Sequence, residues 1–193
     1  MNDVPAYILA GGQSSRFGSD KARALVDGVP LIARIAAALR PVTRSVTVVS
    51  DVAGKYADLG LETIADAQPG LGPMGGLHTA LTHLPGAADW LLLVSCDLVV
   101  LERAWIDALL AARTPEARAV AFMEVQGWQP LLALYHRAIA VEVDEHIARG
   151  QRSMRKLLDS VGGVGLPRPA DWPEVLQVNT RDDLARHAHR RQA

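Results

Sequence analysis

The sequence predicts an α/β protein: one Rossmann-like, doubly wound domain with a mostly parallel sheet, spanning residues 1–193. Short apolar or β-branched runs alternate with amphipathic stretches up to about residue 125, which is the order of repeated βαβ units. Two runs, Val46–Val49 and Leu91–Val94, are continuously apolar or β-branched. That pattern is typical of strands covered on both faces in a parallel sheet. At 193 residues, one domain holds a substantial core and a second is not needed.

Five strands are expected in the first part of the chain: Tyr7–Ala10, Ser45–Ser50, Glu62–Ala65, Trp90–Ser95 and Arg118–Val125. Three helices are expected between them, at 30–40, Gly76–Leu84 and Glu102–Arg113. In the first helix, Pro30 fits the first helical position and Pro41 marks the end. Leu31, Ile35 and Leu39 recur every four residues, so they form one apolar face.

The pattern changes after residue 125. We expect a strand at Gln129–Tyr135, helices at Ala138–Arg149 and Met154–Val161, and a late strand at Val175–Val178. Thr180 is placed to cap a last helix, and the Pro- and Gly-rich stretch Gly162–Pro173 is interpreted as a surface loop. The domain is therefore treated as two halves, 1–115 and 116–193.

The segment 9–21 has the composition of a phosphate-binding loop. The first predicted strand ends in Gly11 and Gly12, and Arg16, Gly18 and Lys21 follow. Glycines let backbone N–H groups approach an anion, and Arg and Lys supply positive charge. The spacing matches neither a P-loop nor the G-x-G-x-x-G dinucleotide fingerprint. We therefore expect Arg16 and Lys21 to stabilise charge on a polyphosphate.

A glycine pair or an aspartate follows each of four predicted strands where the strand ends: Gly11 with Gly12, Asp51, Asp66 and Asp97. Ligands of doubly wound sheets bind at the carboxyl ends of the strands, so these residues are expected on one edge. A carboxylate at that edge is suited to Mg²⁺, which takes oxygen ligands and bridges to substrate phosphates. Asp97, delivered by an apolar strand, is the predicted metal ligand.

Composition excludes several function classes. A net charge of −1 gives no general attraction to nucleic acid or to anionic membranes, and aromatic residues at 5% offer few stacking platforms. The single cysteine, Cys96, excludes an internal disulfide. No secretory signal or membrane span is recognised, so the expected compartment is the cytoplasm and no membrane partner is expected.

Residues 9–21 resemble the L-A-G-G-x-S-x-R-[MF]-G-x-D-K signature of the molybdenum cofactor guanylyltransferases (MobA), whose fold is nucleotide-diphospho-sugar transferase-like. The later Cys96-Asp97 pair matches the family's C-D-x-P motif without its flanking prolines. The expected nucleotide contacts are Leu9, Ala10, Gly11, Gly12, Lys21, Asp66, Gly75 and Asp97. The expected catalytic residues are Arg16, Lys21 and Asp97, with Arg152 and Asn179 binding the acceptor.

The resemblance implies transfer of GMP from GTP to the terminal phosphate of molybdenum-molybdopterin, giving the guanine dinucleotide and pyrophosphate with Mg²⁺ as cofactor. It also implies contacts with cofactor-delivery proteins and molybdoenzyme chaperones. It makes 1–115 the nucleotide-binding half of the domain and 116–193 the acceptor-side half. Gly11 favours the guanylyl branch, because related cytidylyltransferases have L-A-A-G at this point. Two alternatives stay open: a sibling enzyme that uses CTP or another phosphorylated acceptor, and a non-catalytic GTP-binding homologue.

Overall fold

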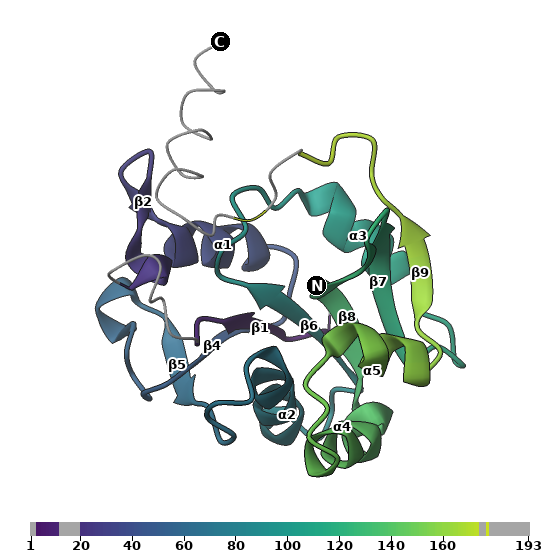
Figure 1. The fold of residues 1–193 in the computed structure, drawn as a ribbon. Helices are drawn as coiled ribbons and strands as arrows, with labels where there is room; N and C mark the ends of the chain where they lie inside the picture. The colour runs from purple at the N-terminus through teal and green to yellow at the C-terminus, as the bar shows by residue number, and fades with distance from the viewer. Residues whose placement is uncertain (1–2, 12–19, 174–176, 178–193) are drawn as a thin grey trace.

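The computed structural model describes residues 3–11, 20–173 and 177 (Figure 1). Its main sheet has seven strands in the order β5-β4-β1-β6-β8-β7-β9. Their bounds are β1 Ala6–Leu9, β4 Val46–Ser50, β5 Glu62–Ala65, β6 Trp90–Ser95, β7 Ala119–Glu124, β8 Gly127–His136 and β9 Val164–Pro167. Strand β8 runs antiparallel to β6 and β7, and the other neighbouring pairs are parallel. The prediction of a doubly wound, mostly parallel sheet is confirmed.

The strand order creates a switch point beside β1. From β1 the chain moves outward to β4 and β5, and then returns to the opposite side of β1 to form β6. Crossover connections on the two sides of such a point diverge and leave a crevice at the carboxyl ends of the strands. The residues that follow β1 and β6 border this crevice.

Helices cover both faces of the sheet (Figure 1). The first face carries α1 Leu31–Leu39 and α3 Arg103–Ala111; the second carries α2 Pro73–His83, α4 Ala140–Ala148 and α5 Met154–Ser160. Alternation along β1 shows why both faces must be covered. Ala6 and Ile8 are buried in the first core, and Tyr7 and Leu9 in the second. Burial on both faces explains the continuous apolar runs of the central strands.

The start of α1 corrects one prediction. Pro30 lies outside the helix, as the last residue of a hairpin formed by β2 Leu25–Val26 and β3 Val29–Pro30. At the hairpin turn, Asp27 and Gly28 have φ values of 53° and 78°. Positive φ at both positions defines the two-residue turn that Asp-Gly favours. The predicted helix Gly76–Leu84 likewise begins earlier, because Pro73 occupies its first turn.

The interpretation of Gly162–Pro173 as a loop is wrong for Val164–Pro167, which form β9 and pair in parallel with β7. Gly165 lets this strand lie close to its neighbour, since a Cβ there would come within 2.8 Å of Met123 Cγ. Of the late strand predicted at 175–178, only Gln177 is among the described residues, and it bridges to Leu98. Thr180 and the last predicted helix lie outside them. No described helix is both long and apolar enough to cross a membrane.

Candidate active site

The four predicted edge residues occupy one level of the sheet. Leu9 pairs with both Val49 and Ser95, and Val49 pairs with Ile64. Two residues further along each strand lie Gly11, Asp51, Asp66 and Asp97. In the order of the sheet they follow as Asp66, Asp51, Gly11 and Asp97. Three carboxylates and the glycine segment therefore meet at the carboxyl edge, as predicted from the strand ends.

A cavity of about 730 Å³ opens at this edge, a size that suits a small-molecule ligand. The lining comes from β1, β4, β6, β8 and α2 and from the segments that follow β1, β4 and β5. It includes Leu9, Ala10, Gly11, Asp51, Lys55, Asp66, Gly70, Gly76, Ser95 and Leu131. Four of the expected nucleotide contacts, Leu9, Ala10, Gly11 and Asp66, are thus in its wall. Lys21 and Asp97 lie beside the β6 end of the cavity, and Gly12 and Arg16 fall outside the described residues.

Lys21 and Asp97 form an ion pair across the switch point. Lys21 Nζ lies 2.8 Å from Asp97 Oδ2, and the two side chains are only 15% and 14% exposed. Lys21 begins the short 3-10 helix η1, Lys21–Arg23, and Asp97 directly follows β6. The structure therefore brings together two of the three predicted catalytic residues, although 76 positions separate them in the sequence.

Asp97 has one oxygen to spare. Its Oδ1 is buried and has no hydrogen-bond partner within the described part of the chain. Buried polar atoms are nearly always paired, so this carboxylate oxygen is a suitable position for a cation or a hydrogen-bond donor. Mg²⁺ fits, because it commonly takes one or two carboxylates and completes its shell with phosphate and water. Over the same residues, no cluster of three His, Cys, Asp or Glu side chains offers an all-protein metal site.

Asp20 positions Lys21. Its carboxylate caps η1 by accepting a hydrogen bond of 3.1 Å from the Ala22 amide, and it also accepts one of 3.0 Å from the Tyr56 hydroxyl. Tyr56 is fully buried, and burial, with the nearby Asp20 charge, raises the pKa of its hydroxyl. The neutral hydroxyl therefore stays a donor at physiological pH. The Asp-Lys part of the predicted signature combines an anchor with the cation that it holds in place.

Asp66 is engaged in local structure. Its Oδ1 accepts hydrogen bonds of 2.9 Å from the Gln68 amide and from the Thr79 hydroxyl of α2. These bonds fix the segment 67–72, which forms one wall of the cavity. Gly75 allows a close approach of two backbone segments, because a Cβ at this position would collide with the Gln68 carbonyl oxygen. The neighbouring Gly76 lines the cavity, and its Cβ would come within 2.7 Å of Leu9 Cδ2.

Arg152 reaches the cavity wall from the acceptor-side half. One terminal nitrogen donates a hydrogen bond of 3.0 Å to the Gly70 carbonyl, 82 positions away in the sequence. Its basic neighbours have other partners: Arg149 pairs with Glu145, and Arg155 donates to the Trp128 carbonyl. Of the two expected acceptor-binding residues, Arg152 thus lies at the rim, and Asn179 is outside the described residues.

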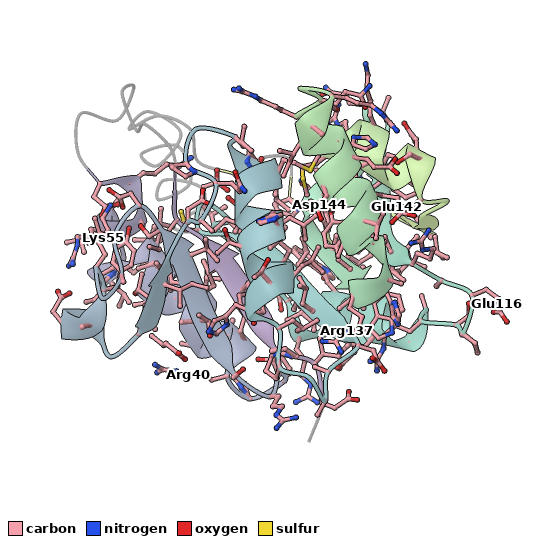
Figure 2. The ribbon with its side chains drawn as sticks, turned by 90° about the horizontal axis from the view of Figure 1, so that it is seen from below. Arg40, Lys55, Glu116, Arg137, Glu142 and Asp144 are labelled. Carbon is pink, nitrogen blue, oxygen red and sulfur yellow. The ribbon has the colours of Figure 1, made fainter. Side chains whose placement is uncertain are left out.

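The sequence analysis missed Lys55. Its Nζ donates a hydrogen bond of 2.7 Å to Asp51 Oδ1, and both residues line the cavity. Although partial burial opposes protonation, the hydrogen bond to Asp51 and the Asp20 charge raise the pKa of Lys55 above its ordinary value. Figure 2 labels Lys55 on the segment that follows β4. The available signal was a lysine four residues after an aspartate at a strand end.

Comparison with known proteins identifies the family. A family model described as a MobA-like NTP transferase domain matches residues 6–164. The chain belongs to this family. A probable molybdenum cofactor guanylyltransferase from Deinococcus radiodurans is 39% identical over 187 residues, covering 91% of this chain and 95% of the relative. One from Synechococcus elongatus is 34% identical over 186 residues, covering 92% and 94%.

The MobA-like fold is also seen in solved structures. The molybdopterin-guanine dinucleotide biosynthesis protein A of Archaeoglobus fulgidus superposes with a TM-score of 0.78 at 23% identity, covering 98% of this chain and 99% of that one. The chain is thus a nucleotidyltransferase with the nucleotide-diphospho-sugar transferase fold, and its relatives act in molybdenum cofactor biosynthesis.

Proposed function

We propose that this MobA-like enzyme transfers GMP from GTP to the terminal phosphate of molybdenum-molybdopterin. The products are molybdopterin guanine dinucleotide and pyrophosphate. The observation that carries the proposal is the Lys21–Asp97 pair with its spare, buried Asp97 Oδ1 at the switch point of the sheet. The names of the relatives, probable molybdenum cofactor guanylyltransferases, support the choice of substrates.

The reaction is an in-line displacement at the α-phosphorus of GTP. An oxygen of the acceptor's terminal phosphate forms a bond to that phosphorus, and the bond to the oxygen bridging to the β-phosphate breaks. Pyrophosphate leaves with the electron pair of the broken bond. A phosphate monoester has its second pKa near ~6, so the nucleophile is already ionised at neutral pH and no general base is required.

The protein's contribution is then positioning and charge. Lys21, held by Asp20 and paired with Asp97, places an ammonium group where negative charge gathers on the phosphates. Asp97 would hold Mg²⁺ through Oδ1, and the bound ion would supply Lewis-acid stabilisation of the phosphate oxygens. Fixed cations of this kind are the main catalytic devices in phosphoryl-type transfers. Arg16 is proposed to act beside Lys21.

The acceptor is proposed to approach from the side of β8 and α5. Leu131 of β8 lines the cavity there, and Arg152 lies at its rim. A guanidinium can bind a phosphate with two parallel hydrogen bonds, so Arg152 is suited to the phosphate of the pterin. Asn179 is proposed to contact the same substrate.

The experiment is a pyrophosphate-release assay with purified protein, molybdenum-loaded molybdopterin and Mg²⁺, run separately with GTP, CTP, ATP and UTP. Of the four nucleotides, we expect only GTP to give pyrophosphate release, and we expect mass spectrometry to detect the guanine dinucleotide. Release with CTP in place of GTP would assign the chain to the cytidylyl branch. Tight GTP binding without release would show a non-catalytic homologue.

A further inference from the structure

The Asp51–Lys55 pair has no part in the chemistry described so far, yet it lines the cavity. Its two charged ends lie 2.7 Å apart at the carboxyl end of β4. Ion pairs this exposed contribute little to stability, since Asp51 is 64% and Lys55 29% exposed. Because the pair contributes little to stability and lies in a ligand cavity, we attribute it to recognition of the ligand.

The pair is held in place from three sides. The fully buried Ser50 hydroxyl lies 2.8 Å from Asp51 Oδ1 and 3.2 Å from the Ala10 carbonyl, which ties Asp51 to the end of β1. Lys55 Nζ is 3.7 Å from the Asp20 carboxylate and lies over the Tyr56 ring. The donor and the acceptor are therefore positioned before any ligand arrives.

The pair also has hydrogen-bonding capacity left. Within the described residues, both hydrogen bonds to Asp51 go to Oδ1, so Oδ2 can accept from a ligand. Lys55 has three N–H groups, and two face Asp51 and Asp20, so the third can donate. Asp66 also accepts through Oδ1 alone, from Gln68 and Thr79, but no lysine in the described part of the chain is paired with it. The cavity thus offers a donor directly beside an acceptor.

The sheet fixes which part of a nucleotide lies here. If the reacting phosphate lies at Asp97, the nucleoside extends across the strand ends toward β4 and β5. Asp51 is two strand spacings from Asp97, about 10 Å, with Gly11 of the β1 end between them. That distance passes the ribose and reaches the base. Each hydroxyl of the ribose can donate and accept, so the choice of the base over the ribose rests on this distance.

We propose that Asp51 and Lys55 read the edge of guanine: Lys55 donates to O6, and Asp51 Oδ2 accepts from N1–H. Adenine and cytosine present an amino group where guanine has O6, and a ring acceptor where guanine has N1–H. In the same position, either base would place its amino group against the Lys55 ammonium and its ring acceptor against the Asp51 carboxylate. The proposal rests on the proposed function, and it adds residues that discriminate guanine from adenine and cytosine.

The test measures dissociation constants by calorimetry with Mg²⁺ for GTP, ATP, 2-aminopurine riboside triphosphate and inorganic triphosphate. In Lys55→Met and in Asp51→Ala, GTP should bind roughly tenfold more weakly, the scale of one good base-edge contact. ATP and the 2-aminopurine nucleotide should bind no more weakly than to the wild type, because each variant removes a mismatched group, and inorganic triphosphate should change little. The preference for GTP should therefore collapse. Asp58→Asn is the matched control. It removes an ion pair with Arg23 from the same segment, outside the cavity wall, and should leave all four constants unchanged.

Each other outcome overturns the proposal in a recognisable way. An equal loss for all four ligands would show that Lys55 binds phosphate, and an equal loss for GTP and ATP in Asp51→Ala would show a ribose contact. A GTP preference that persists in both variants would refute the base-reading role while leaving the proposed guanylyl transfer intact. A wild-type protein that turns over CTP rather than GTP would end the proposed function first.

Discussion

Replacing Asp97 with alanine should abolish turnover without unfolding the protein. At 2.8 Å and an effective dielectric of about 20, the attraction between Lys21 and Asp97 is about 6 kcal/mol before the cost of desolvation. The net contribution of such a charged hydrogen bond is ~1.5–3 kcal/mol. The unpaired Oδ1 costs ~1–3 kcal/mol in the opposite direction, and the alanine removes it as well.

The two contributions nearly cancel, so the free energy of unfolding should change by no more than about 2 kcal/mol, against a typical total of about 5–15 kcal/mol. Turnover should fall by at least ~10²–10³, the usual loss when one fixed electrostatic group is removed from a transition state. The assay is pyrophosphate release across a Mg²⁺ titration, with urea unfolding run in parallel. If Asp97→Ala kept more than a tenth of wild-type turnover, the carboxylate would have no place in the mechanism.

Three further substitutions test other parts of the structure. Lys21→Met should lower both kcat and GTP affinity, measured by steady-state kinetics and calorimetry; a change in neither would exclude Lys21 from phosphate binding. Gly76→Ala should push Leu9 into the cavity and weaken nucleotide binding with little loss of melting temperature, because the contact at 2.7 Å is with a side-chain end. Arg118 holds the pKa of Glu142 below its ordinary value of 4.5, so the pair stabilises the fold above about pH 4.5 and loses that effect as the pH falls through the lowered pKa. The urea midpoints of wild type and Glu142→Gln should therefore differ at pH 7 and converge as the pH falls through the lowered pKa; a constant difference would contradict this.

The central sheet was predictable because its strands are buried on both faces. Runs such as Leu91–Val94 are apolar throughout, and a polar residue at each strand end marks the edge where ligands bind. The single-level arrangement of Asp51, Asp66 and Asp97 follows from parallel pairing alone. Such features depend on short-range patterns, which a sequence displays directly.

The features that could not be predicted from the sequence depend on contacts between segments that lie far apart in the chain. Strand β9 contains Gly165 and Pro167, both poor strand formers, and it exists because β7 offers a free edge. A role for Lys55 could be inferred only from the structure, which shows it in the cavity wall on the segment that follows β4. Asp66 matches a nucleotide-binding position by resemblance, yet its hydrogen bonds to Gln68 and Thr79 became visible only with α2 in place.

The hydrogen bond from Arg152 to the Gly70 carbonyl has a thermodynamic consequence. In the proposed function, the guanidinium lies on the acceptor's side of the crevice, and the carbonyl belongs to the wall around the nucleotide. An anion that drew Arg152 away would remove this bond from the wall, so we expect the binding of the two ligands to be coupled. Reciprocity then requires that each change the other's affinity by the same factor, whichever arrives first.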